Sequence, residues 1–269
     1  MKQKISIIGC GWLGFPLAKA LIDKGYSVKG STTSEAKLSK LKAANIDDFL
    51  IQLTAEGMVG DNKDFLADSH TIIINIPPGI RKNPGKNHVA ELQHLISAIE
   101  NSSIKNVLYI SSTSVFLDDV DFPTIKHDTS PNGVSNSAQQ LIKIEELLQN
   151  NPNFNTSIIR FGGLFNETRH PARYLSGRQN VSNPEAPINL IHLQDCIGII
   201  SEVIVNNHWN CTLNAASPSH PSKKDYYTAY CEAHNLVAPQ FNFDIKSQGK
   251  LIDSSKVEQL LNYTFQYNP

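Results

Sequence analysis

The sequence predicts an α/β protein with a doubly wound parallel sheet. Short apolar segments rich in isoleucine and valine alternate along the chain with longer segments that carry apolar residues at helical spacing. The short segments are apolar throughout, which is typical of strands covered by helices on both faces. A turn rich in glycine joins the first strand to the first helix. Strands that alternate with helices in this way favour a parallel sheet.

The predicted strands are bounded by glycine, proline and other turn residues. They lie at 4–9, 26–31, 71–78, 106–112, 156–162 and 211–216, with a further short strand near 240–245. The predicted helices follow them at 12–25, 34–44, 87–100, 137–150, 193–206, 222–235 and 254–261. Gly25 lies past the end of the first helix as a C-cap, and we expect Ser34 to cap the second.

The alternation is interrupted between Asn166 and Pro187, where Pro, Gly, Asn and Arg are frequent. Long irregular segments in compact domains are usually functional or disordered. We expect residues 1–163 plus 189–216 to form the sheet domain. Residues 164–188 plus 217–269 are expected to form a small C-terminal substrate lobe over the carboxyl edge of the sheet, where such sheets bind ligands.

Composition excludes several classes of function. The chain has 269 residues and a formal net charge of -1, so it lacks the basic character of a nucleic-acid-binding protein. The four cysteines, Cys10, Cys196, Cys211 and Cys231, form no C-x-x-C pair, which argues against a zinc site or a disulfide framework. No apolar run reaches the roughly 18 residues that span a bilayer. We therefore expect a cytoplasmic protein with no metal, no membrane and no nucleic acid among its partners.

The turn after the first strand reads GCGWLG, with Gly9, Gly11 and Gly14 in G-x-G-x-x-G spacing. In such turns the first glycine allows the tight bend, the second lets a pyrophosphate approach the backbone, and the third lets helix and strand pack closely. The helix N-terminus offers N–H groups and a positive dipole end to phosphates. The strand before and the helix after it favour a dinucleotide site over a turn without ligand. The expected cofactor contacts are Gly9, Cys10, Gly11, Trp12, Leu13 and Gly14.

The end of the second strand bears on the choice between NADP and NAD. The acidic residue that binds a ribose 2′-OH in NAD sites is expected next to Thr32, and no acid is there. Hydroxyl residues stand in its place, and we expect Ser31, Thr32 and Thr33 to contact the cofactor. Lys29 and Lys37 lie nearby and can bind a 2′-phosphate. This pattern favours NADP, while the lack of an arginine leaves NAD open.

The segment NIPPG at 75–79 follows another strand and is expected beside the glycine turn. Ile76, Pro77 and Pro78 are candidate contacts to the cofactor. Prolines donate no hydrogen bond, so they would pack against ribose or adenine. A rigid loop without ligand is the equal alternative.

Four landmarks occur in the order of a known family: GCGWLG at the start, SSTSVF at 111–116, NLIHLQDC at 189–196 and LNAASPSHP at 213–221. Together they resemble the extended and atypical short-chain dehydrogenase/reductases, the NAD-dependent epimerase/dehydratase group, over nearly the whole chain. The resemblance implies an NAD(P)-binding Rossmann fold, a small-molecule substrate whose identity stays open, and a homodimer.

In that family the serine-rich run supplies a catalytic Ser or Thr, which corresponds here to Ser112. Phe116 then stands in the slot of the usual aromatic residue. By the same resemblance Ser111 is a cofactor contact, and Thr113 and Ser114 lie within reach of the substrate.

The family also uses a Y-x-x-x-K pair for proton transfer, and this chain lacks it. The tyrosine slot falls on Ser137 and the lysine slot on Leu141, and no tyrosine is followed by lysine four residues on. Lys143 lies roughly 200° around the helix from position 141 and does not replace the pair.

Four further residues are candidate substrate contacts. They are Arg160 at a strand end, Arg169 and His170 in the irregular segment, and His192 in NLIHLQD. Arginines beside a nucleotide site suit phosphate or carboxylate recognition. The alternatives are a solvated loop for the segment and a hydrogen-bonded anchor for His192. Asp195 is expected to cap or support the helix start.

Two classes of function remain open. The first is an NAD(P)-dependent oxidoreductase or epimerase-like enzyme, in which Ser112, a water or a histidine of the lobe transfers the proton. The second is a non-catalytic NADP-binding redox sensor or regulatory protein. The missing pair favours the second class, whereas the retained SSTSV run and the arginines favour the first.

Overall fold

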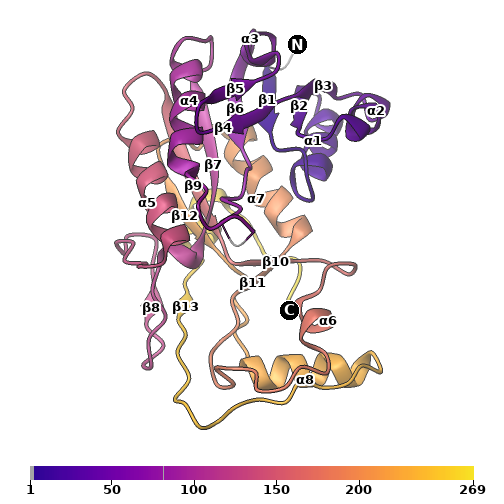
Figure 1. Ribbon diagram of the computed structural model, residues 1–269, viewed down its shortest axis with the longest axis vertical. Coiled ribbons are helices and arrows are strands. Elements are labelled where there is room, and N and C mark those ends of the chain that lie inside the picture. The colour runs from indigo at the N-terminus through magenta and orange to yellow at the C-terminus, as the bar shows by residue number, and fades with distance from the viewer. Residues whose placement is uncertain (1–2, 81) are drawn as a thin grey trace. The chain divides into compact units, whose positions relative to one another are not determined.

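The computed structural model describes residues 3–80 and 82–269, and their backbone forms a seven-stranded sheet (Figure 1). The strand order is β12-β9-β7-β6-β1-β2-β3. The strands are β1 (Lys4–Ile8), β2 (Ser27–Thr32), β3 (Asp47–Leu50), β6 (Ser69–Ile74), β7 (Asn106–Ser112), β9 (Asn155–Phe161) and β12 (Thr212–Ala215). The pairs β3–β2, β2–β1, β1–β6 and β6–β7 are parallel, so the predicted doubly wound fold is confirmed.

Helices join these strands. They are α1 (Gly14–Asp23), α2 (Leu38–Ala43), α3 (Asn62–Leu66), α4 (His88–Glu100), α5 (Asn136–Gln149), α6 (Pro171–Leu175), α7 (Leu193–Val205), α8 (Lys223–Ala233) and α9 (Ser255–Leu261). Three small strand pairs complete the structure: β4 (Gln52–Thr54) with β5 (Gly57–Val59), β8 (Thr124–Ile125) with β13 (Leu251–Ile252), and β10 (Gly163–Phe165) with β11 (Leu190–His192). Across the described ranges, no helix is long and apolar enough to cross a membrane.

The chain reverses its direction across the sheet between β1 and β6. From β1 it proceeds to β2 and β3 on one side, and from β6 it proceeds to β7, β9 and β12 on the other. Right-handed crossovers then put α1 and α4 on opposite faces, and Figure 1 shows α5 beside α4. The ends of β1 and β6 are paired at Ile8 and Ile74. Ligands of open α/β sheets bind at such a switch point.

Burial on both faces explains why the central strands are apolar throughout. Ile7 in β1, Ile73 in β6 and Leu108 in β7 are fully buried, as are most of their neighbours along each strand. Each buried isoleucine or leucine contributes roughly 1.5–3 kcal/mol through removal of apolar surface from water. The sheet therefore provides a rigid base for the loops at its carboxyl edge.

Side-chain caps begin several helices. The Asn87 side chain accepts from Ala90 N at the start of α4, and the Ser135 hydroxyl accepts from Ala138 N at the start of α5. The predicted cap by Ser34 is wrong, because its hydroxyl makes no capping bond. Instead Ser34 N donates to Thr32 Oγ1, and a 3-10 turn precedes α2.

The strand predicted near 240–245 is wrong. Phe241, Phe243 and Ile245 alternate with polar residues, but Phe243 and Ile245 are exposed, so the alternation faces no core. An isolated bridge from Phe241 to Val181 is formed there, and the strand β13 lies later in the chain. The segment between Asp47 and Leu66, for which no element is predicted, contains β3, the β4–β5 hairpin and α3.

Contacts group the chain into two compact units. Unit 1 comprises Met1–Ser112, Val134–Ile159 and Ile200–Thr212, and unit 2 comprises Thr113–Gly133, Arg160–Ile199 and Leu213–Pro269. Within unit 2 a small apolar cluster joins α6 and α8 to β10 and β11; its buried members are Phe165, Ala172, Ile188, Leu190, Tyr227 and Cys231. The predicted boundaries of a sheet domain and a substrate lobe differ from these units and stay a prediction.

Candidate dinucleotide site

Two positions of the glycine turn after β1 accept only glycine. Gly9 has a φ of +101°, and a side chain there would collide with the Asn75 carbonyl oxygen. A Cβ on Gly14 would collide with the Gly9 carbonyl oxygen. Gly9 therefore makes the bend and Gly14 lets the first turn of α1 pack onto it, as the motif predicts.

Gly11 differs from both of these glycines because it faces open space. No atom lies within 4 Å of the position that its Cβ would take, and the residue is exposed. The helix α1 begins three residues later, and no side chain caps its first turn. An uncapped helix N-terminus beside open backbone suits a pyrophosphate, so the geometry of the turn fits a dinucleotide.

Ser31 and Asn75 hold the turn from the two neighbouring strands. Gly9 N donates to Ser31 Oγ at 3.1 Å, and Cys10 N donates to Ser31 O at 2.8 Å. Asn75 Nδ2 donates to Gly9 O at 3.0 Å. Ser31 is 1% exposed, so its hydroxyl supports Gly9, and a direct contact from Ser31 to the cofactor stays a prediction. Asn75 is absent from the predicted site, although it is the first residue of the NIPPG segment.

The remaining residues of the GCGWLG turn differ in exposure. Leu13 is buried in the core and Trp12 is half-buried. Cys10 is buried against β2, and its burial raises the pKa of the thiol to about 12. The thiol is therefore neutral and unreactive at physiological pH, and Cys10 can meet a ligand only through its backbone.

The hydroxyl of Thr33 and the side chain of Lys37 are exposed to solvent past the end of β2. Thr32 Oγ1 accepts from Ser34 N at 3.1 Å, while Thr33 and Lys37 are exposed. Lys29 does not lie at this site, contrary to expectation: its ammonium donates to the carbonyl oxygens of Asp64 and Ala67, near α3. The 2′-phosphate hypothesis therefore depends on Thr33, Thr32 and Lys37.

The loop after β6 lies against the glycine turn. Ile76 Cγ1 is 3.4 Å from the position of a Cβ on Gly9, so Ile76 is in van der Waals contact with the bend. Pro77 is exposed and Pro78 is half-buried. The structure thus brings Ile76 to the site, and whether the two prolines cover a ligand stays a prediction.

The serine-rich end of β7 is tied to helix α5. Ser111 is buried, and its hydroxyl donates to Glu145 Oε1 at 2.5 Å, so it anchors the helix to the strand. Ser112, the candidate catalytic hydroxyl, is half-buried at the end of β7. Glu145 is not among the predicted site residues. Its place between Leu141 and Leu148 on the buried face of α5 indicates a carboxylate with a buried partner.

By the family resemblance, Ser137 and Leu141 stand at the positions of the family's tyrosine and lysine, and neither side chain titrates near neutral pH. Ser137 is half-buried in the first turn of α5, and Leu141 is packed in the core. Lys143 is exposed and pairs with Glu146 at 3.2 Å. Lys143 thus faces away from the buried side of the helix, as expected from its position.

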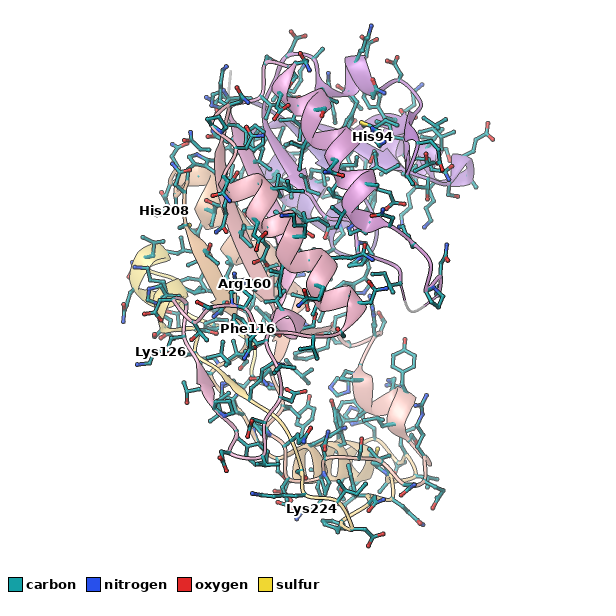
Figure 2. All side chains as sticks on the ribbon, turned by 60° about the vertical axis from the view of Figure 1, so that its left-hand side comes forward. His94, Phe116, Lys126, Arg160, His208 and Lys224 are labelled. Atoms are coloured by element: carbon teal, nitrogen blue, oxygen red, sulfur yellow. The ribbon has the colours of Figure 1, made fainter. Side chains whose placement is uncertain are left out.

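The other predicted substrate contacts lie in unit 2. Thr113 is buried in a 3-10 turn and Ser114 is exposed. Arg160 is buried, and its guanidinium lies 5.1 Å from the centre of the Phe116 ring. Figure 2 labels both side chains. Arg169 is exposed. Within the described part of the chain, no group of three or more His, Cys, Asp or Glu residues is arranged to hold a metal.

His170 belongs to an aromatic cluster. Its ring stacks on Tyr230 at 3.7 Å, and its Nδ1 accepts from Ala172 N at 3.2 Å. Nε2 therefore carries the proton and donates to the Tyr226 hydroxyl oxygen at 2.7 Å. Burial, with the nearby charges of His234 and Arg173, lowers the pKa of His170 to about 4. The ring is neutral at physiological pH, which supports a structural role.

His192 is similarly enclosed. Its ring stacks on Tyr267 at 3.9 Å, and its Nε2 lies 3.2 Å from Glu167 Oε1. The Phe165 ring contacts both His170 and His192, so the structure brings these two histidines around one phenylalanine.

Asp195 anchors the C-terminal segment to the start of α7. Its carboxylate accepts from the Tyr263 hydroxyl at 2.8 Å and from Gln266 N at 2.9 Å. The expectation that Asp195 supports the helix start is therefore refined, because its partners come from the end of the chain.

Comparisons with known proteins agree with this fold. Residues 4–115 match the family model described as the NAD binding domain of 6-phosphogluconate dehydrogenase. Two solved structures from Bacillus cereus share the fold. UDP-glucuronic acid 4-epimerase in complex with NAD has 17% identity and a TM-score of 0.80 over 99% of this chain and 93% of that chain. UDP-N-acetylglucosamine 4-epimerase has 16% identity and a TM-score of 0.79, over 99% and 92%.

A curated relative gives the family. Protein YeeZ of Escherichia coli K12 is 32% identical over 268 residues, which cover 98% of this chain and 96% of YeeZ. Identity at this level along nearly the full length of both proteins reflects common descent and a common fold. Residues 4–115 match an NAD-binding domain, and the chain therefore belongs to the YeeZ family.

Proposed function

We propose that the protein is an NAD(P)-dependent oxidoreductase of the epimerase-like type that acts on a small molecule. The observation that carries the proposal is the glycine turn at the switch point of the sheet. Gly9 and Gly14 are sterically required there, whereas Gly11 opens a space that packing does not use. A turn serving packing alone would not need the open glycine beside an uncapped helix.

The chain would hold the cofactor through backbone groups of Gly11 to Leu13 and through the loop that begins at Ile76. The bound nicotinamide would supply the hydride chemistry, while the protein binds, orients and polarises. Ser112 is the candidate that would hydrogen-bond the substrate oxygen during proton movement. A serine hydroxyl is a far weaker acid than a phenol, so Ser112 would polarise rather than release a proton.

We infer a preference for NADP over NAD. Thr33 and Lys37 are exposed past the end of β2, and no carboxylate stands at Thr32 to repel a 2′-phosphate. Lys37→Glu should reduce NADPH affinity about tenfold or more and leave NADH affinity within about twofold, because a charged contact to phosphate is lost. Equal loss for both cofactors would argue against recognition of the 2′-phosphate.

A second candidate is a non-catalytic NADP-binding sensor. The observation in its favour is that Ser137 and Leu141 occupy the slots of the family's proton-transfer pair. A sensor would bind cofactor and change a partner interaction or its oligomeric state, without consuming NADPH.

Titration of the purified protein with NADPH and NADH tests the site. Trp12 lies inside the glycine turn and should report occupancy through quenching of its emission. Trp209→Phe removes the other tryptophan, so the signal then comes from Trp12 alone. Saturable quenching by either cofactor supports the proposal, and its absence together with a flat calorimetric titration would contradict it.

A turnover assay then separates the enzyme from the sensor. Ser112→Ala should abolish turnover on any carbonyl or nucleotide-sugar substrate found in a screen, while cofactor affinity stays within about twofold. Consumption of NADPH that is unchanged in Ser112→Ala would remove this residue from the mechanism. Binding without turnover across the panel would favour the sensor.

A further inference from the structure

Three charged or titratable side chains meet in unit 1 at the start of α4. Lys86 Nζ lies 3.0 Å from Glu91 Oε2, and His88 Nδ1 lies 2.9 Å from the same oxygen. His88 is 0% exposed, and the side chain of Glu91 is 8% exposed. The side chain of Lys86 remains 25% exposed. One buried carboxylate oxygen therefore fixes both a buried imidazole and an ammonium that reaches solvent.

The protonation of this cluster follows from its contacts. Burial lowers the pKa of His88, and the opposing effect of Glu91 is smaller, so the ring is neutral at physiological pH. The neutral ring donates its Nδ1 proton to Glu91, and Nε2 is left buried without a hydrogen bond of normal geometry. The positive charge of the cluster therefore resides on Lys86.

A backbone brace holds the cluster against the first turns of α5. His88 N donates to Gln140 Oε1 at 2.7 Å, and Gln140 Nε2 donates to Lys86 O at 3.1 Å. Gln140 Nε2 also donates to Asn136 Oδ1 at 2.9 Å. Lys86 is thus held, through Gln140, against the same helical turns that carry Ser137, the empty tyrosine slot.

The cluster also lies against the loop that borders the glycine turn. A Cβ on Gly79 would lie 3.6 Å from Lys86 Nζ, so the ammonium is beside the end of the NIPPG segment. The Ile76 backbone slightly opposes the lowering of the His88 pKa, and Ile76 Cγ1 lies 3.4 Å from the position of a Cβ on Gly9. Contacts therefore run from the phosphate-binding turn through Ile76 to the cluster.

We propose that Lys86 is a further cofactor-binding residue, whose ammonium binds oxygen atoms of the dinucleotide at the loop after β6. The inference rests on the proposed function. Glu91 takes one of the three donors of the ammonium, which leaves donors for ribose hydroxyl or phosphate oxygens. Lys86 thereby supplies from the start of α4 a positive charge that Leu141 does not supply from α5. Glu91 and His88 act as positioning residues that fix the ammonium.

The test compares three variants in calorimetric titrations with NADPH, NADH and ADP. Lys86→Met should weaken NADPH and NADH about tenfold or more, since a hydrogen bond from a charged group is lost. Lys86→Arg keeps the charge and should stay within about threefold of wild type. Lys143→Met is the matched control, because Lys143 forms a similar pair with Glu146 on the exposed side of α5, and it should leave affinity unchanged.

The ligand series locates the contact. Equal weakening of ADP and NADH in Lys86→Met places the ammonium on the pyrophosphate side, and weakening of NADH alone places it on the nicotinamide ribose, which ADP lacks. Either result supports the proposal. If Lys86→Met lowers the thermal midpoint, the affinity of Lys86→Arg decides, and a loss of affinity in Lys86→Arg as large as that in Lys86→Met would overturn the proposal.

Failure of the inference and failure of the proposed function are distinguishable. Wild-type protein that binds cofactor while Lys86→Met binds it equally well overturns the role of Lys86 alone. Wild-type protein that binds none of the three ligands overturns the dinucleotide site itself.

Discussion

Single residues in the glycine turn have separable tasks. Gly9 is needed for its backbone conformation, Gly14 for close packing and Gly11 for the space in front of it. Ser31 is a support for the bend rather than an exposed hydroxyl. The spacing of the motif predicts the roles of the three glycines because it encodes backbone geometry. It contains no information on which neighbouring side chains turn inward.

The first prediction contrasts two glycines. Gly9→Ala should lower the free energy of unfolding by about 1–3 kcal/mol or more, because alanine is strained at positive φ and its Cβ collides with Asn75. Gly11→Ala should change it by under about 0.5 kcal/mol, since its Cβ meets nothing. Urea denaturation measures both. Similar losses in the two variants would refute the distinction.

His170 makes stability depend on pH. The unfolded ring takes up a proton below about pH 6.5, whereas its folded pKa is about 4. The unfolded state therefore binds more protons between these values, and stability falls as the pH drops from about 6.5 to 4, by up to about 3 kcal/mol. Urea unfolding at several pH values should show this slope, and His170→Phe should show a smaller one. An unchanged slope would mean that other groups dominate.

At the scale of elements, the match between sequence and structure depends on burial. The strand predicted at 106–112 has the same bounds as β7, because its apolar residues Val107 to Tyr109 are fully buried. The edge strand β3 begins with the charged residues Asp47 and Asp48, so an apolar run does not predict it. The false strand near 240–245 shows the reverse, since alternation occurs there without a core to face.

The attachment of α5 to β7 yields the third prediction. Ser111→Ala removes a 2.5 Å hydrogen bond to the buried carboxylate of Glu145. The loss should be about 1.5–3 kcal/mol in the free energy of unfolding, the range for hydrogen bonds to charged groups. Ser137→Ala, a half-buried serine on the same helix, serves as control and should cost under about 1 kcal/mol. Equal losses of stability in Ser111→Ala and Ser137→Ala would show that the hydrogen bond to Glu145 adds nothing beyond the effect of removing a half-buried serine hydroxyl.

At the scale of the whole molecule, the sequence predicts the fold class and the glycine turn better than the contacts around them. The fold class follows from alternation, and the turn follows from three glycines. Asn75, Glu145 and Lys86 have partners that lie between five and 66 residues away in the chain. Contacts between distant segments depend on strand order, which local patterns do not encode. The aromatic partners of His170 and His192 are likewise not encoded by local patterns.

Ligand binding should stabilise the protein as a whole. A cofactor that binds the proposed site in the folded chain and not in the unfolded one should add about 2.7 kcal/mol at one hundred times its dissociation constant. Thermal denaturation with and without NADPH measures this shift. Gly11→Val should lose the shift while keeping its own midpoint near that of wild type, because the open space is filled. A retained shift in that variant would contradict the use of this space by the cofactor.

The burial of Cys10 between Gly9 and Gly11 has a consequence for how the turn behaves over time. A thiol enclosed against β2 and held neutral meets an alkylating reagent only when the bend transiently opens. Its rate of alkylation therefore measures local opening of this one loop. A ligand bound on the turn should slow the alkylation of Cys10, whereas a ligand bound elsewhere should leave its rate unchanged.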